Sequence, residues 1–312
     1  MVKQFLLLLI TGLLCSNFLP AQVHKQTYTY AVKKTDTLRL DVYSATDTGN
    51  VVKTPCVLFV FGGAFVGGKR DDSNYHQYFS SLAGHGIKVV AMDYRLGLKG
   101  VNNLSVFNTA PLQQAISMAA DDLFDATNWL LKNSNSIGID TSKIILSGSS
   151  SGAVTVLQSE YMKINEQPES RKLPLQFQYA GVIAFSGAIL SYKGTPAYKT
   201  IPAPTLFFHG TADKIVPYKK VGLFNKGMYG SSTLASVYKQ KNYSYYIYRA
   251  QGLGHEVSVI PMITQIPLIL DFIDRYVIKD QHLQIDMTVN DPAEKPMLTI
   301  SAKALFKKLA AK

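Results

Sequence analysis

Cysteine is scarce in this chain, with two in 312 residues. Cys15 lies in the apolar N-terminal stretch, so Cys56 is the one thiol expected in the rest of the chain, and one thiol forms no internal disulfide. A chain of this length can bury enough apolar surface to fold without such bridges. Cys56 lies within the apolar run CVLFVF, which predicts a small core residue rather than a nucleophile.

Motifs for metal, cofactor or nucleic-acid binding are also lacking. No group of His, Cys and Asp residues has the spacing of a metal site, so we expect neither metal nor cofactor. The net charge is +11, but its lysines are scattered and no basic block interrupts the middle of the chain. We therefore expect no nucleic-acid partner.

Long apolar runs are confined to the N-terminus. Lys3 is followed by a nearly unbroken apolar run at 5–14 and by a small residue, Ala21. This run is short for a membrane span, which predicts a secretory signal peptide over 1–21 and an exported protein, periplasmic or extracellular. An uncleaved anchor is the alternative, whereas Leu14 before Cys15 argues against a lipoprotein signal.

The remaining chain alternates buried strands with amphipathic helices, and turn signals separate them. The expected strands cover 56–61, 87–94, 143–148, 180–185, 204–210 and 243–250, and the expected helices cover 73–86, 111–133, 149–162 and 261–278. This alternation predicts an α/β fold, with a mostly parallel sheet covered by helices on both faces. Alternating residues at 27–46 predict an antiparallel edge hairpin.

The predicted folded domain covers residues 22–278. Residues 279–312 form a C-terminal appendage to which the sequence assigns no structure. It ends in the basic amphipathic stretch SAKALFKKLAAK. We expect a solvated terminal helix here. Membrane contact is expected only through this end or the signal segment.

Three consecutive serines between two glycines stand out in GSSSG at 148–152. They follow a predicted buried strand and precede a predicted helix, and only Ser150 lies at the centre of a G-x-S-x-G pattern. A nucleophilic serine on a sharp strand-to-helix turn needs this pattern, because the glycines give the turn room. A flexible serine–glycine loop is the alternative.

A serine nucleophile requires a base and an acid that orients the base. Asp213 and His255 each follow a predicted strand, so both are expected at the carboxyl edge of the sheet beside Ser150. His209 is predicted to be structural.

Two other acids compete with Asp213 for this role. Asp93 is expected to pair with Arg95, and Asp140 is expected to shape the turn before the nucleophile strand.

Backbone N–H groups are the expected donors to the oxyanion. Ser151 follows the nucleophile at the start of a helix, where free N–H groups favour negative charge. The segment FGGAFVGG supplies Gly62, Gly63 and Ala64 from the loop after the first buried strand. An ordinary glycine turn is the alternative for this second segment.

Together these motifs resemble the α/β-hydrolase superfamily, and more narrowly the bacterial esterases related to carboxylesterases and hormone-sensitive lipase. The resemblance covers about residues 37–278 and rests on FGGAFVGG, VVAMDYRL, GSSSG, HGTADKIVP and GHEV. Phe61 stands where the family usually has histidine, and Ala64 where it has a glycine. The resemblance implies an eight-stranded sheet and a Ser150–His255–Asp213 triad without a metal.

The resemblance further implies hydrolysis of carboxylic esters through an acyl-enzyme, on a small-molecule or polysaccharide-linked substrate. The segment at 191–203, where many relatives carry a lid, is short, which predicts a small or absent lid and short acyl chains. An exported peptidase of the prolyl-oligopeptidase type and an inactive hydrolase-like binding module are the alternatives. The oligomeric state stays open.

Overall fold

The computed structural model describes residues 23–45, 52–101, 108–302 and 304–305. The predicted signal peptide and the last residues of the basic end lie outside these ranges. Within them, no helix is both long and apolar enough to cross a membrane.

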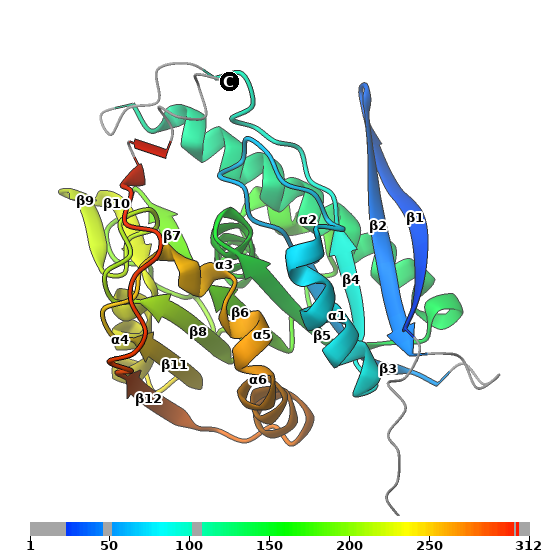
Figure 1. The fold of residues 1–312 in the computed structure, drawn as a ribbon. Helices are drawn as coiled ribbons and strands as arrows, with labels where there is room; N and C mark the ends of the chain where they lie inside the picture. The colour runs from blue at the N-terminus through cyan, green and yellow to red at the C-terminus, as the bar shows by residue number, and fades with distance from the viewer. Residues whose placement is uncertain (1–22, 46–51, 102–107, 303, 306–312) are drawn as a thin grey trace, which may run out of the picture.

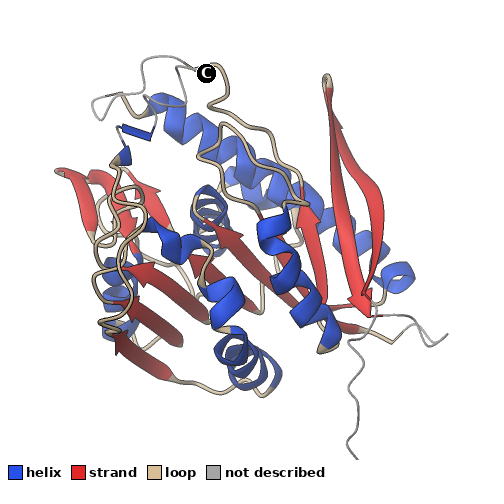
Figure 2. Ribbon diagram, in the orientation of Figure 1, coloured by secondary structure: helices blue, strands red, loops and turns tan. Residues whose placement is uncertain are grey.

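A central sheet of nine strands forms the middle layer, in the order β1-β2-β4-β3-β5-β6-β8-β11-β12 (Figures 1 and 2). β1 pairs with β2 and β2 with β4 in antiparallel fashion, whereas all other neighbours are parallel. Its strands are β1 (Val23–Lys33), β2 (Asp36–Ala45), β3 (Thr54–Val60), β4 (Lys88–Met92), β5 (Ile139–Ser149), β6 (Gly181–Phe185), β8 (Thr205–Gly210), β11 (Tyr245–Ala250) and β12 (Gln284–Val289). The predicted fold class and edge hairpin are confirmed, but the sheet has nine strands rather than eight.

Helices cover both faces of this sheet (Figure 2). α1 contacts α5 and α6 on one face, while α2 contacts α3 on the other. The α-helices are α1 (His76–Gly84), α2 (Ala110–Ile137), α3 (Ser151–Ile164), α4 (Ser231–Gln240), α5 (Pro261–Thr264) and α6 (Ile266–Phe272). Shorter helical turns are η1 (Ser73–Tyr75), η2 (Pro168–Lys172), η3 (His255–Ser258) and the π-helix η4 (Ile273–Ile278).

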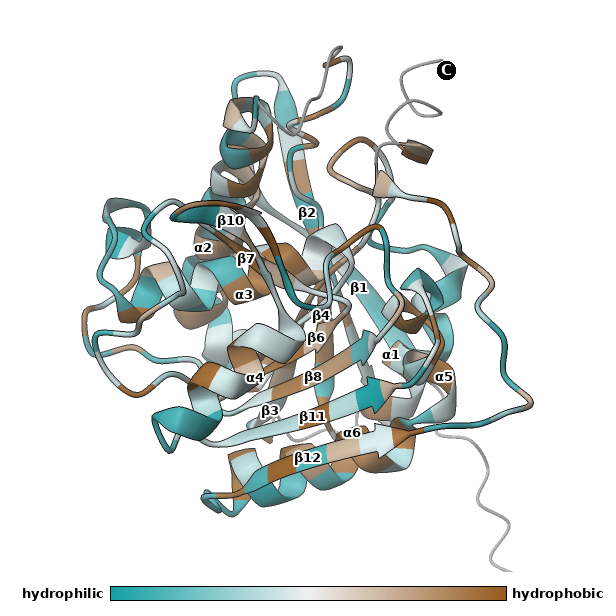
Figure 3. Ribbon diagram, turned by 90° about the vertical axis from the view of Figure 1, so that its left-hand side faces the viewer, coloured by the Kyte–Doolittle hydropathy of each residue, from teal (hydrophilic) through white to brown (hydrophobic). Residues whose placement is uncertain are grey.

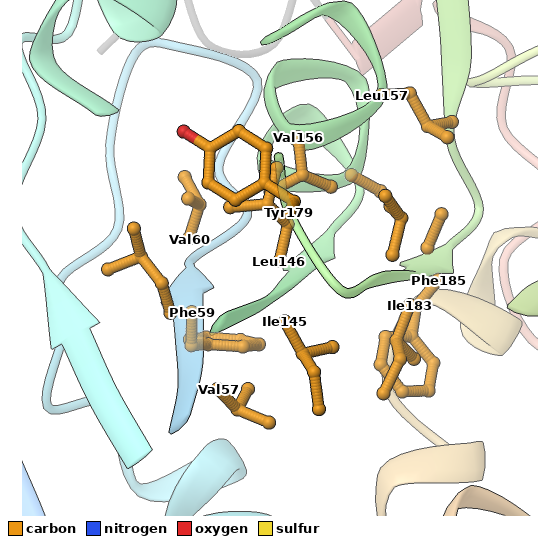
Figure 4. Packing of buried hydrophobic residues seen from close by; sticks show 14 of the residues in the cluster. Val57, Phe59, Val60, Ile145, Leu146, Val156, Leu157, Tyr179, Ile183 and Phe185 are labelled. Carbon is orange, nitrogen blue, oxygen red and sulfur yellow. The ribbon is translucent and has the colours of Figure 1, made fainter. Parts of the chain in front are cut away.

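The core lies between the sheet and the two helical layers (Figure 4). Hydrophobic residues dominate the central strands, because both faces of these strands are covered (Figure 3). Cys56 is fully buried in β3, and burial raises the pKa of its thiol well above the usual value. The prediction that Cys56 is a core residue is therefore confirmed.

A second, three-stranded antiparallel sheet was not predicted. It contains β7 (Ala188–Ser191), β10 (Lys226–Gly230) and β9 (Lys220–Leu223) in that order. Two residues separate the end of β6 from the start of β7, so this small sheet lies beyond the carboxyl edge of the central sheet. Residues 192–204 contain neither helix nor strand.

The C-terminal appendage begins as part of the central sheet, because β12 pairs in parallel with β11. The chain then runs back across the molecule (Figure 1). There the Leu298 N–H donates to Glu256 Oε2 at 3.0 Å, and the Ala302 N–H donates to the Lys214 carbonyl at 3.0 Å. The sheet therefore extends past residue 278, and the appendage reaches the loops that contain Asp213 and His255.

Candidate active site

β5 and α3 meet at Ser150, which has the strained backbone angles φ 53° and ψ −116°. The glycines around it leave no room for a side chain. A Cβ atom on Gly152 would lie 2.0 Å from the Val60 carbonyl oxygen, and one on Gly148 would lie 2.4 Å from the Gly152 carbonyl. The G-x-S-x-G pattern is thus a steric requirement of close strand–helix packing, and the strained turn holds Ser150 at its apex.

The three serine hydroxyls have different surroundings. Ser149 is buried and donates a hydrogen bond to the Ser258 carbonyl at 2.9 Å. The Ser151 hydroxyl is buried 3.3 Å from the Tyr94 hydroxyl. Of the three hydroxyls, only that of Ser150 contacts a histidine.

Ser150, His255 and Asp213 form one hydrogen-bonded chain. Ser150 Oγ lies 2.7 Å from His255 Nε2, and His255 Nδ1 lies 2.7 Å from Asp213 Oδ2. Asp213 Oδ1 accepts hydrogen bonds from the N–H groups of Ile215 at 2.8 Å and Val216 at 3.0 Å. The acid is thereby fixed in one orientation with its second oxygen toward the imidazole. The structure thus brings together the three residues predicted as a triad.

His209 forms an additional contact with the acid. Its Nε2 lies 3.4 Å from Asp213 Oδ2 and 3.2 Å from the Val216 carbonyl, and its Nδ1 lies 2.7 Å from Ser231 Oγ. Burial raises the pKa of Asp213, but hydrogen bonds from His209 and His255 outweigh it and hold this pKa well below its usual value. Asp213 therefore stays ionised at neutral pH, and His209, predicted only as structural, contributes to that charge state.

The glycine loop after β3 lies against the Ser150 turn. A Cβ atom on Gly62 would lie 3.2 Å from the Ser150 Cβ. The Gly62 N–H, however, donates to the Tyr75 hydroxyl at 3.1 Å. This occupied N–H corrects the prediction that Gly62 is a free oxyanion donor, and Gly63, Ala64 and Ser151 remain the candidates. Tyr75 had no sequence signal that linked it to this loop.

Phe61 occupies the position where the family usually has histidine, and it anchors the glycine loop. Its ring is buried, with its centroid 4.4 Å from that of Tyr94. The Tyr94 hydroxyl donates to the Phe61 carbonyl at 3.1 Å. Ala64 and Phe65, next along the loop, adopt positive φ angles of 56° and 60°. Aromatic packing and a tyrosine hydrogen bond therefore position this backbone without histidine.

Known proteins share parts of this arrangement. The family model BD-FAE matches residues 40–189, which include the glycine loop and Ser150 but neither Asp213 nor His255. The structure of a thermophilic esterase from Thermogutta terrifontis with bound butyrate is similar, with a TM-score of 0.61, 17% identity and coverage of 84% of this chain and 96% of that one. The chain has the α/β-hydrolase fold.

Two curated relatives of this chain are esterases. Acetylcholinesterase of Gallus gallus is 31% identical over 121 residues, which are 39% of this chain and 15% of that protein. Fumonisin B1 esterase of Sphingopyxis macrogoltabida is 29% identical over 119 residues, 38% of this chain and 22% of that protein. The matches thus span about a fifth of the relatives' length. The predicted resemblance to α/β-hydrolase esterases is confirmed.

The two acids that compete with Asp213 have partners of their own. Asp93 accepts a hydrogen bond from Arg70 Nη1 at 2.7 Å, whereas Arg95 Nε donates to Asp122 at 2.9 Å. The predicted Asp93–Arg95 pair is therefore wrong. Asp140 accepts hydrogen bonds from the N–H and hydroxyl of Ser142, which confirms that it shapes the turn.

Three carboxylates on α2 lie close enough to share a cation, with ligand atoms within 4.8 Å of one another: Asp121, Asp122 and Asp125. Each already has basic partners. Lys33 and Lys172 pair with both Asp121 and Asp125, and Arg95 pairs with Asp121 and Asp122. This cluster is an ion-pair network that ties α2 to neighbouring segments.

Proposed function

We propose that this α/β-hydrolase cleaves carboxylic esters by acyl transfer through Ser150. The observation that carries the proposal is the chain from Ser150 Oγ to His255 Nε2 and from His255 Nδ1 to Asp213, with both contacts at 2.7 Å. A serine hydroxyl becomes nucleophilic when an adjacent oriented base removes its proton. The likeness to esterases supports the choice of ester substrates.

In the first half-reaction, Ser150 Oγ attacks the ester carbonyl carbon while its proton moves to His255 Nε2. The tetrahedral intermediate then breaks its bond to the alcohol oxygen, and His255 gives the proton to the departing alcohol. Asp213, ionised by its surroundings, stabilises the imidazolium that forms in between. Water then repeats these steps on the acyl-enzyme, which releases the acid and restores Ser150.

The tetrahedral oxyanion needs donors beside Ser150. Backbone N–H groups of Gly63, Ala64 and Ser151 are proposed for this role, because the Gly62 N–H is already bound to Tyr75. Each such donor typically lowers the barrier by about 3 kcal/mol.

Short acyl chains are the proposed substrates. Residues 192–204 carry no helix or strand that would cover the site as a lid. The similar Thermogutta terrifontis esterase has been solved with butyrate and with propionate bound, which fits short acids in that protein. The ester is proposed to belong to a small molecule or a polysaccharide. The N-terminal sequence supports export to the periplasm or the medium.

The test compares hydrolysis of p-nitrophenyl acetate, butyrate and palmitate by the wild-type protein, Ser150→Ala and the control Ser149→Ala. Wild type and the control should prefer the short esters, and Ser150→Ala should lose activity by at least about ten-thousand-fold. Preference for palmitate would reject the short-acyl proposal. Cleavage of prolyl peptides without ester hydrolysis would support the peptidase alternative, and inertness toward both substrates would support the binding module.

A further inference from the structure

The β9–β10 hairpin has an apolar tip that is exposed to solvent. All residues from 219 to 225 are exposed, and the exposed fractions are 63% for Val221, 68% for Leu223 and 84% for Phe224. β9 is an edge strand of the small sheet and projects from one side of the molecule (Figure 1). Clustered exposed apolar side chains usually mark a site that contacts another surface.

The segment around this tip is uniformly basic. From residue 214 to residue 241 there are six lysines and no aspartate or glutamate: Lys214, Lys219, Lys220, Lys226, Lys239 and Lys241. None of the six belongs to an ion pair with another described residue. Their charge is therefore available to an external anionic surface.

Two of these lysines brace the hairpin itself. Lys220 Nζ donates to the Phe224 carbonyl at 3.0 Å, and Lys226 Nζ lies 4.8 Å from the centroid of the Tyr192 ring. Both ammonium groups are thus held beside the apolar tip.

The base of the hairpin adjoins the candidate active site. β10 pairs with β7, which continues beyond the carboxyl end of β6. Ser231, the first residue after β10, contacts His209, which in turn touches Asp213. A surface that binds the tip would therefore lie near the carboxyl edge of the central sheet, which is also the edge that carries Ser150.

We propose that the β9–β10 hairpin docks the protein on an anionic lipid surface. Val221, Leu223 and Phe224 would enter the headgroup region, and the flanking lysines would contact the lipid phosphates. Apolar insertion combined with basic charge is the usual basis of peripheral membrane binding. A second copy of the chain would bring the same lysines and be repelled. An anionic sugar polymer would pair with the charge but leave two aliphatic side chains of the tip in water.

The test is co-sedimentation of the protein with vesicles of phosphatidylcholine alone or with phosphatidylglycerol. Wild type should sediment only with the anionic vesicles, and raising NaCl from 0.05 to 0.5 M should release it, because salt screens the lysines. Phe224→Ser should lower partitioning by about fivefold or more, through lost apolar burial. The double variant of Lys220→Gln and Lys226→Gln should lower it by about tenfold or more.

The matched control is Ile201→Ser. Ile201 is 71% exposed and precedes β8, at the opposite edge of the central sheet. This variant should sediment like wild type, and hairpin variants should retain wild-type melting temperatures and p-nitrophenyl acetate hydrolysis.

The proposal would be overturned if the protein bound neutral vesicles as well as anionic ones, or if it bound no vesicles. It would also be overturned if Ile201→Ser lowered binding as much as the hairpin variants do. So would binding to polygalacturonate without binding to vesicles, or concentration-dependent dimerisation that Phe224→Ser abolishes. Vesicle binding does not require turnover, so its outcome is independent of the proposed ester hydrolysis.

Discussion

Replacing Asp213 by asparagine should trap His255 in the wrong tautomer. The asparagine carbonyl would keep the hydrogen bonds that Asp213 Oδ1 accepts from Ile215 and Val216 at 2.8 and 3.0 Å. The amide NH₂ would then occupy the position of Oδ2 and point at His255 Nδ1 across 2.7 Å. Because both groups cannot donate into one hydrogen bond, Nδ1 must accept, and the proton moves to Nε2.

With a proton on Nε2, His255 cannot accept the proton of Ser150 Oγ. An Asp-to-Asn change of this kind in a serine triad lowers turnover by about ten-thousand-fold. This corresponds to about 5 kcal/mol of additional activation free energy.

The assay is kcat for p-nitrophenyl acetate at pH 7.5, with Asp140→Asn as the matched control. Asp140 is also an ordered acid, but its partner is Ser142 in a turn outside the site. The control should keep wild-type activity. A folded Asp213→Asn protein whose kcat falls less than tenfold would refute the assigned role of this acid.

Three further changes test the packing of buried residues. Burial raises the pKa of Glu160 to about 7 from an ordinary value of 4.5, so folding favours its protonated form and stability is lost as pH rises through this window. Between pH 5 and pH 8 this group should lower the free energy of unfolding, measured in urea, by about 2 to 3 kcal/mol. Glu160→Gln should remove this pH dependence. The same dependence of the unfolding free energy on pH in wild type and variant would contradict the prediction. Gly152→Ala places a Cβ atom 2.0 Å from the Val60 carbonyl oxygen. It should cost about 3 kcal/mol or more and abolish ester hydrolysis, whereas a wild-type melting temperature would show that the turn is not sterically required. Tyr75→Phe removes the acceptor of the Gly62 N–H and should lower the free energy of unfolding by about 1 to 3 kcal/mol, and an unchanged urea midpoint would contradict this role.

Local patterns predicted the elements that carry Ser150, Asp213 and His255. Each follows a buried apolar strand, and parallel strands bring their carboxyl ends to one edge, so sequence position determined spatial position. The glycines of GSSSG were equally informative, because the lack of space at Gly148 and Gly152 is a property of the turn itself.

The small sheet and β12 were missed for different reasons. β9 and β10 are four and five residues long, contain glycine and lysine, and lack an apolar run. In β12, alternating Ile285, Met287 and Val289 gave a period-two signal, but the strand has no fully buried residue. Pairing with β11 stabilises it, and such tertiary pairing is not encoded in local propensity.

Contacts between distant polar side chains could not be derived from sequence. Asp93 and Arg95 are near in sequence, yet Asp93 binds Arg70, two residues after the glycine loop, and Arg95 binds Asp122 of α2. The link between Tyr75 and Gly62 similarly depends on how η1 packs against the loop after β3. The packing of distant segments determines which polar side chains pair with one another, and a single sequence does not show this packing.

The most direct test of Ser150 as the nucleophile is covalent labelling with a fluorophosphonate, followed by fragmentation mass spectrometry of the peptide that carries Ser149, Ser150 and Ser151. We expect one adduct, on Ser150, in the wild type and in Ser149→Ala. We expect no adduct in Ser150→Ala or in heat-denatured protein, because reactivity depends on the folded contact with His255. An adduct on a neighbouring serine, or a folded wild-type protein that resists labelling, would contradict the proposed nucleophile.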